Sequence, residues 1–501
     1  MIRLPSLLLI CGSLLVPALA GAQGAAEAKK PVRTVHQRLK PCKVEGIQKD
    51  VLCGALAVWE NRTARSGRKI DLNVVVIPAQ SDSPAPDPVV YINGGPGYGS
   101  TGAAGGFSQL LATVNKDRDL LFVDQRGTGK SNPLHCDLPG SDSNLQDYVR
   151  GLFPMDVLRA CEPKLAARAD LTQYTTPIAA DDLDEVRAWL GYERLNVLGG
   201  SYGTRAAQAY MRQHPDHVRS AALLGVMIMD ARMPVYHARK AQESLDKLFD
   251  DCAADASCRA AFPELRADLA AVIARLDQGP VRQTIKAPKT GKPVELSIAK
   301  GAFTTTLRSM QYSPFLSVRI PLYVHLAAQG DYAPMILMTI ADRTDPGWDV
   351  GLYLSITCAE DVARIDPQEV PALVANTYQG DDRIRDQREA CSFWPKASVP
   401  EAFFQPLEST IPTLLLTGWL DPATPPEWAA EVTCHLPNST NVVIRDGAHS
   451  PGGLAHLDCF ARLISDFVVN GTPFGLDTTC VKEMKRPAFL TKDEPLPAGG
   501  D

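Results

Sequence analysis

The chain lacks the features that mark several large classes of protein. It has no C-x-x-C pair among its 12 cysteines, and its nine histidines are scattered, which argues against a zinc site. A formal net charge of -6 gives no basic surface for nucleic acid and no reason to propose a role at a membrane surface. No internal repeat stands out. We therefore expect no metal, no cofactor and no nucleic-acid partner.

The apolar run at the start of the chain, residues 7–16, is too short to span a bilayer. Arg3 precedes it and small residues at positions 18 and 20 follow it, which is the pattern of a secretory signal. Cleavage after residue 20 or residue 22 fits, and we take residues 1–22 as the signal peptide. The protein is thus expected to be exported, either periplasmic or secreted, without a stable membrane anchor.

Export favours disulfides, and the cysteines suggest how they pair. Removing Cys11, which lies in the signal, leaves 11 of the 12 cysteines. Sequence alone does not determine connectivity, so pairing between near neighbours is the first hypothesis. It leaves Cys434 free and gives these pairs: Cys42 with Cys53, Cys136 with Cys161, Cys252 with Cys258, Cys358 with Cys391, and Cys459 with Cys480.

Strand-like and helix-like patterns alternate over much of the chain, which predicts an α/β fold with a mostly parallel sheet covered on both faces. The alternation stops after about residue 230, becomes predominantly helical, and resumes near residue 411. Strands are predicted at 72–77, 89–92, 120–123, 195–198, 221–226, 413–417 and 442–444. We expect an α/β core in 35–230 and 401–485, a helical lid in 231–400 and a tail in 486–501.

Residues 199–203 read Gly-Gly-Ser-Tyr-Gly, a G-x-S-x-G pattern between a predicted strand and a predicted helix. Small residues on both sides of Ser201 permit the strained turn that lifts a nucleophilic hydroxyl clear of a sheet. The alternative is a glycine-rich turn without chemistry. Residues 93–97, Asn-Gly-Gly-Pro-Gly, also follow a strand and supply a second motif. We assign the amides of Gly95 and Tyr202 as donors to an oxyanion.

Two further motifs follow later strands. Asp421 lies after the strand at 413–417, and His449 lies after the strand at 442–444. A carboxylate can orient a histidine that takes the proton of Ser201, and the order Ser, Asp, His is that of an α/β-hydrolase. The alternative role for Asp421 is the N-cap of a helix, and Asp446 is the second candidate for the acid.

Two other patterns are set aside. Residues 127–131 resemble the end of a phosphate-binding loop, but Asp124 stands where its first glycine is required, so nucleotide hydrolysis is not expected. His214 and His217 are interpreted as part of a helix end rather than as ligands.

Together these motifs make the chain resemble the proline iminopeptidase and tripeptidyl aminopeptidase branch of the α/β-hydrolases, with a tripeptidyl-aminopeptidase-like C-terminal region. The resemblance rests on residues 93–97, 123–131, 199–205, 421–426 and 447–449 and spans nearly all of the mature chain. It implies Ser201 as nucleophile, Asp421 as acid and His449 as base. Proline iminopeptidases usually have histidine where this chain has Asn93, which makes strict proline specificity less secure.

The resemblance also implies acidic residues near the lid that hold the free amine of a small peptide. Glu360 and Asp361 are the candidates, with a solvated helix start as the alternative, and residues 394–395 could line the same pocket. The expected activity is that of a serine exopeptidase acting through an acyl-enzyme. An esterase or lipase on the same triad is the main alternative, and a non-catalytic hydrolase-like binding protein is the third.

Overall fold

The computed structural model describes residues 34–344 and 347–492. The predicted signal peptide and the end of the predicted tail, residues 493–501, lie outside this part of the chain. Within it, no helix combines the length and the apolar character needed to cross a membrane.

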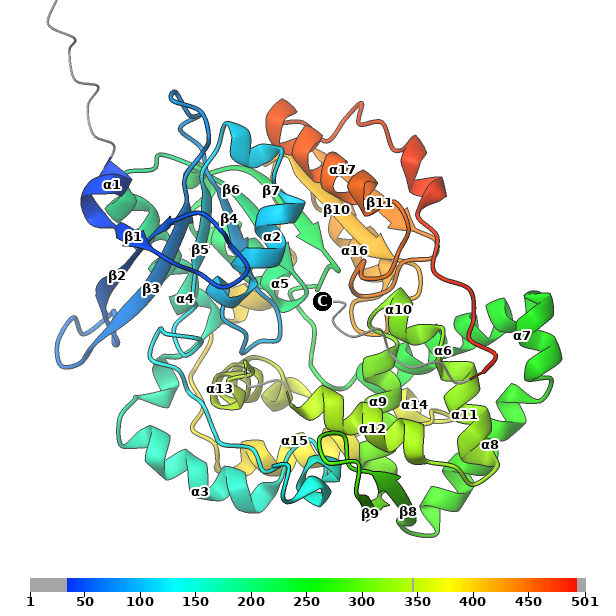
Figure 1. The fold of residues 1–501 in the computed structure, drawn as a ribbon. Coiled ribbons are helices and arrows are strands. Elements are labelled where there is room, and N and C mark those ends of the chain that lie inside the picture. Colours follow the sequence, from blue (N-terminus) through cyan, green and yellow to red (C-terminus); the bar gives the residue numbers. More distant parts are fainter. Residues whose placement is uncertain (1–33, 345–346, 493–501) are drawn as a thin grey trace, which may run out of the picture. The chain divides into compact units, whose positions relative to one another are not determined.

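Nine strands form one sheet in the described part of the chain (Figure 1). All seven predicted strands belong to it; the run predicted at 221–226 ends at Leu224, because Gly225 takes a φ of +63°. The pairs are parallel from β5 to β11 and antiparallel from β1 through β3 to β5. In spatial order the strands are β1 (Lys40–Cys42), β2 (Val51–Trp59), β3 (Lys69–Ile77), β5 (Leu120–Val123), β4 (Val89–Ile92), β6 (Leu195–Gly200), β7 (Val218–Leu224), β10 (Thr413–Gly418) and β11 (Ser439–Ile444).

The strands β1 and β2 were not predicted. The middle of β2 is partly exposed, so its apolar pattern is broken there. By contrast, every residue of β10 is buried, which is typical of a strand covered on both faces. The sequence signal was therefore strong where the sheet is covered and weak near its edge.

Helices cover both faces of the sheet. On β3, Val74 and Val76 pack with α4 (Thr176–Leu190), α5 (Tyr202–Gln213) and α16 (Pro426–Cys434). Val75 and Ile77 point to the opposite face, where α2 (Ala104–Leu110) and α17 (Leu457–Asn470) lie. The short helix α1 (Thr34–Arg38) precedes β1, and α3 (Met155–Ala166) lies between β5 and α4 in the chain.

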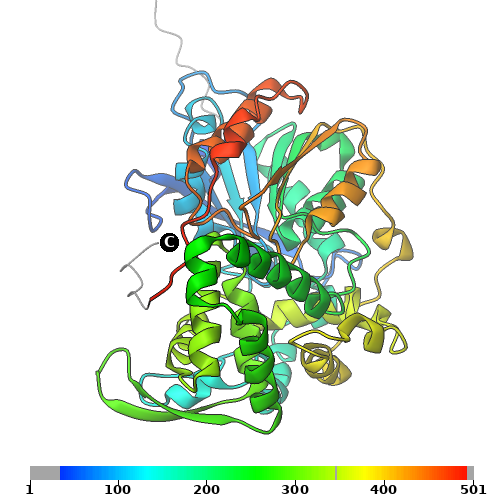
Figure 2. The same ribbon diagram turned by 90° about the vertical axis from the view of Figure 1, so that its right-hand side faces the viewer.

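Between β7 and β10 the chain forms an inserted segment, residues 225–412, which is mainly helical as predicted. Its β8–β9 hairpin was not predicted, and Figure 2 shows it at the end remote from the sheet. The elements are α6 (His237–Ala254), α7 (Ala256–Ala261), α8 (Leu265–Asp277), β8 (Val281–Lys286), β9 (Pro293–Ile298), α9 (Lys300–Met310), α10 (Pro314–Ser317), α11 (Ile320–Ala328), α12 (Ala333–Arg343), α13 (Val350–Glu360), α14 (Val370–Val374) and α15 (Asp382–Phe393).

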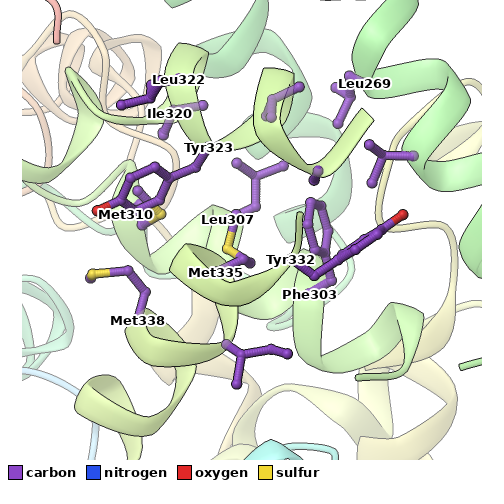
Figure 3. Packing of buried hydrophobic residues seen from close by; sticks show 14 of the residues in the cluster. Leu269, Phe303, Leu307, Met310, Ile320, Leu322, Tyr323, Tyr332, Met335 and Met338 are labelled. Atoms are coloured by element: carbon purple, nitrogen blue, oxygen red, sulfur yellow. The ribbon is translucent and has the colours of Figure 1, made fainter. Parts of the chain in front are cut away.

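The inserted segment packs around a hydrophobic cluster (Figure 3) that also includes residues from outside it: Leu145, Val149, Leu420 and Phe489. Phe303 and Leu307 of α9 pack there with Met335 of α12 and with Tyr332, whose ring meets that of Phe303 edge-on at 6.1 Å. Complete burial of each such side chain contributes about 1.5–3 kcal/mol. Contacts among its own helices therefore contribute to the shape of the segment.

The inserted segment meets the loops at the carboxyl ends of the parallel strands. Trp348 Nε1 donates to the carbonyl of Pro96, after β4, at 3.1 Å. The amide of Ser450, after β11, donates to the carbonyl of Tyr312 at 2.8 Å. This edge of the sheet is where α/β folds place their sites.

Five disulfides join the pairs predicted from near neighbours, so that hypothesis is confirmed: Cys42–Cys53, Cys136–Cys161, Cys252–Cys258, Cys358–Cys391 and Cys459–Cys480. Cys434 is free and exposed, also as predicted. The fourth bond links α13 to α15 within the inserted segment.

Replacing Cys358 and Cys391 together by alanine should lower the free energy of unfolding by about 3 kcal/mol, because the bond closes a loop with a sequence separation of 33. Equilibrium denaturation in urea measures this change. Cys434→Ser is the control and should leave the midpoint where it is. A double variant as stable as the wild type would show that the link between α13 and α15 contributes nothing.

Candidate active site

Ser201 occupies a strained turn between β6 and α5. Its φ of +55° and ψ of -124° are rarely adopted by a residue with a side chain. The turn is fixed by the Ser201 amide, which donates to the carbonyl of Leu224 in β7 at 2.8 Å. It also needs glycine nearby, because a Cβ at Gly199 would lie 2.5 Å from the carbonyl oxygen of Gly203. The hydroxyl is thereby held at the carboxyl edge of the sheet, as the motif predicts.

Asp421 and His449 are brought together from the loops after β10 and β11. His449 Nδ1 lies 2.8 Å from Oδ2 and 3.0 Å from Oδ1 of Asp421, which is almost completely buried. A carboxylate only accepts, so Nδ1 carries the proton and Nε2 is left as an acceptor. This is the tautomer that a general base requires.

Thr424 belongs to the same cluster and was missed in the sequence. Its hydroxyl lies 2.8 Å from Asp421 Oδ2 and 3.1 Å from His449 Nδ1. Its amide and that of Ala423 donate to Asp421 Oδ1, each at 2.8 Å. Asp421 thus orders its own loop and is not the cap of α16, whose N-cap position belongs to Pro425. The sequence feature that could have identified Thr424 is its hydroxyl side chain three residues after Asp421, the candidate acid.

Asp446, the second candidate for the acid, points elsewhere. Its carboxylate lies 3.7 Å from Lys485 and 3.7 Å from Arg486, both in the C-terminal segment. It makes no ion pair with His449 among the described residues. The geometry favours Asp421 as the partner of the histidine.

The loop after β4 is held in shape by Asn93. The Asn93 side-chain oxygen accepts from the amide of Gly94 at 2.8 Å and from the hydroxyl of Tyr91 at 3.0 Å, and its nitrogen donates to Gly99 at 3.0 Å. This amide network stands where proline iminopeptidases usually have histidine. The loop carries Gly95, whose φ is +108°.

The two residues whose amides are assigned as oxyanion donors line the same cavity. Gly95, Ser201 and Tyr202 line it together. In the described part of the chain the amides of Gly95 and Tyr202 donate to no other group, and Tyr202 begins α5, where helix amides have no partner within the helix. Two such donors beside a nucleophile can stabilise an anionic tetrahedral intermediate.

The remaining wall of the cavity comes largely from the inserted segment. Tyr312 lies against His449, with ring centroids 4.7 Å apart. Ser201 Oγ makes no hydrogen bond to any described residue, and hydrogen bonds between nucleophile and base often tighten only when substrate is bound. The charged or polar lining residues from the segment are His237, Arg308, Tyr312, Tyr353, Thr357, Asp361 and Arg383.

The two predicted amine anchors have different surroundings. Glu360, at the end of α13, is completely buried and accepts from the amide of Thr176 at 2.7 Å and from its hydroxyl at 2.8 Å. Asp361 lines the cavity, and one of its oxygens accepts from Arg205 Nη1 at 2.7 Å. Burial raises the pKa of Glu360 to about 7 and that of Asp361 to about 6, against the opposing charge of Arg205.

Residues 394–395 were expected to line the same pocket, and they do not. Trp394 is buried and its Nε1 donates to Ser355 Oγ at 3.0 Å, beneath α13. The lining of the cavity contains neither residue. The aromatic ring of Trp394, which follows a half-cystine, therefore belongs to the hydrophobic core and not to the cavity wall.

The histidines at the end of α5 approach a carboxylate without forming an open metal site. Asp184, His214 and His217 lie close enough to share an ion. However, Arg187 Nε and Nη2 donate to the two oxygens of Asp184, at 2.8 and 3.2 Å. A cation would have to displace that guanidinium, so the cluster is better described as an ion-pair network around a helix end.

The loop at 127–131 uses its amides within the protein. The amide of Lys130 donates to Asp124 Oδ2 at 3.1 Å, and that of Gly129 donates to Asp349 Oδ2 at 2.9 Å. Carboxylates thus occupy donors that a phosphate would need. This agrees with the expectation that the loop binds no nucleotide.

Asp421→Asn should slow acylation of Ser201 about 10⁴-fold, because the amide no longer holds the required histidine tautomer. The rate of labelling by a fluorophosphonate measures the change. Asp446→Asn is the matched control, with an expected effect within about three-fold, since its contacts are peripheral ion pairs. Equal losses in both variants would contradict the assignment of Asp421.

Glu360→Gln should change how stability depends on pH. The folded protein binds the Glu360 proton up to about pH 7, whereas the ordinary pKa is 4.5, so the wild type loses stability as pH rises across this window. Glutamine cannot ionise. The melting temperature of the variant relative to wild type should therefore be higher at pH 8 than at pH 5, as followed by circular dichroism. The exposed Glu401→Gln should show no such trend, and a pH-independent difference at position 360 would refute the shift.

The chain is similar to several known peptidases. Serine protease Hip1 of Mycobacterium tuberculosis is 26% identical over 491 residues, covering 90% of this chain and 92% of its own. Tripeptidyl aminopeptidase of Streptomyces lividans is 23% identical over 510 residues, covering 92% and 89%. Proline iminopeptidase of Neisseria gonorrhoeae is 27% identical over 150 residues, covering 30% and 36%.

Two family matches agree with the position of the site. Residues 87–280, which include Ser201, match the alpha/beta hydrolase fold family, and residues 376–480, which include Asp421 and His449, match the TAP-like protein family. The inserted segment lies largely between the parts that carry these residues. The chain therefore has the α/β-hydrolase fold with a TAP-like C-terminal region, and it is similar to tripeptidyl aminopeptidase and, over part of its length, to proline iminopeptidase.

Proposed function

We propose that the protein is an exported serine aminopeptidase that releases an amino acid or a short peptide from the free N-terminus of small peptides. The observation that carries the proposal is one cavity lined by Ser201, by the residues of two unpartnered amides, and by Thr424, whose hydroxyl contacts the hydrogen-bonded pair of Asp421 and His449. The names of the relatives, serine protease, tripeptidyl aminopeptidase and proline iminopeptidase, favour a peptide bond as the target.

In the first step Ser201 Oγ attacks the carbonyl carbon next to the scissile bond while His449 Nε2 takes the hydroxyl proton. The new C–O bond moves an electron pair onto the carbonyl oxygen, which the amides of Gly95 and Tyr202 stabilise. The imidazolium formed is stabilised by Asp421, which accepts from Nδ1 at 2.8 Å. Each group acts from a position fixed by a strand end.

In the second step the tetrahedral intermediate collapses, the C–N bond breaks and His449 gives its proton to the leaving amine. The N-terminal part of the substrate remains as an ester on Ser201. Water then attacks this ester with His449 again as base, and the acid product leaves with Ser201 restored. The reaction needs no group beyond these residues and water.

The inserted segment is proposed to act as the lid that selects the substrate. Asp361 is the one described carboxylate lining the cavity, so it is the better candidate for contact with the substrate ammonium. Glu360 lies behind it, with both oxygens engaged by Thr176. A lid of this kind over the catalytic residues would exclude folded proteins and admit short peptides.

Export is supported by the disulfides. Five bonds within the described residues are typical of a protein that folds in an oxidising compartment. The signal pattern at 1–22 agrees with this. Both a periplasmic and a secreted location fit.

The main alternative is a carboxylic ester hydrolase, because the same triad and amides serve esters equally well. The two activities differ in their need for a free amine. An aminopeptidase binds the substrate ammonium, whereas an esterase has no use for one. Blocking the amine therefore separates them.

Acetylation of the substrate amine should lower kcat/KM at least about 100-fold on aminoacyl, dipeptidyl and tripeptidyl chromogenic amides, because the blocked amine carries no charge for the proposed contact with Asp361. The comparison of free and blocked members of each pair also shows how many residues are released. Simple esters of small acids are assayed beside them. Equal turnover of free and blocked amides, or turnover of esters alone, would refute the aminopeptidase.

A further inference from the structure

Two arginines of the cavity have unused hydrogen-bond donors. Arg308 of α9 and Arg383 of α15 line the cavity that contains Ser201. Nε and Nη2 of Arg308 and Nε of Arg383 are buried without any hydrogen-bond partner. In the described part of the chain neither guanidinium makes an ion pair with a carboxylate. Buried charges without a partner are rare, because removing them from water is costly.

The protein holds both guanidinium groups with aromatic rings. The guanidinium carbon of Arg308 lies 5.1 Å from the ring centre of Tyr312, and that of Arg383 lies 4.8 Å from the ring centre of Phe153. Arg383 Nη2 also donates to the hydroxyl of Tyr353 at 2.9 Å. These contacts fix the position of each group without neutralising its charge.

The acidic groups nearby do not balance the two arginines. Asp361 is the described carboxylate of the cavity wall, and it already pairs with Arg205 at 2.7 Å. Asp386, on the same helix as Arg383, affects it only through longer-range attraction. The cavity therefore retains positive charge beside the nucleophile.

The positive charge of the two arginines also affects the pKa of another titratable group in the cavity. His237 lines the same cavity, and its Nδ1 is buried without a partner. Burial first, and then the charges of Arg308 and Arg383, lower the pKa of His237 well below its ordinary value of 6.5. His237 is thus neutral and adds no third positive charge.

We propose that Arg308 and Arg383 bind a carboxylate of the substrate. The inference rests on the proposed function and sharpens its substrate class to short peptides that carry a negative charge near the scissile bond. Guanidinium groups match carboxylate geometry, and both of these line the cavity without a carboxylate partner among the described residues. The charge comes either from an acidic side chain or from the free C-terminal carboxylate of a very short peptide.

The arrangement places a carboxylate and two guanidinium groups in one wall. Asp361 suits a substrate ammonium, and the arginines suit a substrate carboxylate. A short peptide with both groups satisfies both parts of the wall, whereas a neutral ester satisfies neither.

Binding of uncleaved peptides to the Ser201→Ala protein tests the proposal by isothermal titration calorimetry. One pair of tripeptide amides differs only by Glu or Gln at the second residue, and another pair shares a neutral sequence with a C-terminal acid or amide. The charged member of at least one pair should bind about ten-fold or more tightly, and the pair that responds identifies the source of the charge. Equal affinity within both pairs, or binding of none of the four peptides, overturns the proposal.

Arg308→Gln and Arg383→Gln, each in the Ser201→Ala protein, should abolish most of this discrimination while affecting the neutral peptides less. Arg308→Lys should restore part of it, because lysine keeps the charge without the planar fork. Arg385→Gln is the matched control on the same helix, where the side chain is exposed and paired with Asp381 and Asp382. Discrimination that survives in both glutamine variants also overturns the proposal.

Turnover of the same four peptides by the wild-type protein is scored separately. Charge-dependent binding without cleavage would refute the aminopeptidase while upholding the carboxylate site. Cleavage with no preference between charged and neutral peptides would refute the carboxylate site while upholding the aminopeptidase. The two proposals can therefore fail independently.

Discussion

One buried guanidinium joins the catalytic half of the protein to the inserted segment. Arg205 lies on α5, the helix that begins after Ser201, and it is completely buried. Its Nη1 donates to Asp361 at 2.7 Å, and its Nη2 donates to the carbonyl of Met229 at 2.9 Å. Removing one partner of such a pair costs about 3–5 kcal/mol, because the other charge is left unpaired. The positions of α5 and of the end of α13 therefore depend on each other, and so does the cavity that both help to line.

The hydrogen bonds around this pair extend to the proposed oxyanion donor. Glu360 accepts twice from Thr176, whose hydroxyl lies 2.7 Å from the hydroxyl of Tyr202. Gln125 donates to the same Tyr202 hydroxyl at 3.1 Å. Tyr202, the residue after Ser201, is thus anchored by its side chain while its backbone amide donates to no other described group. Glu360, whose pKa is raised by burial, therefore belongs to the hydrogen-bond network that orders the turn at Ser201.

The sequence was sufficient to predict the candidate catalytic residues, because they lie in short motifs that follow strands. Parallel strands bring their carboxyl ends to one edge, so the order of the motifs predicted that Asp421 and His449 would meet. It was insufficient where the direction of a polar side chain depends on tertiary packing. Glu360 and Asp361 are neighbours in the chain, yet the end of α13 sends one toward Thr176 and the other to the cavity. The guanidinium pair escaped notice because helical periodicity identifies apolar faces, not which charged residues turn inward.

Bond cleavage and substrate selection are assigned to different parts of this chain. The proposed catalytic residues stand on loops of the sheet, whereas Arg308 and Arg383 lie on α9 and α15 of the inserted segment and Asp361 directly follows α13. The disulfide between Cys358 and Cys391 links the helices that lead to Asp361 and carry Arg383. A fixed spacing between opposite charges reduces the ordering that binding would otherwise require. Substitutions in these helices can then change which peptide binds without disturbing the groups that break its bond. Because the disulfide links the two helices, such substitutions change the side chains of the cavity and not the positions of the helices.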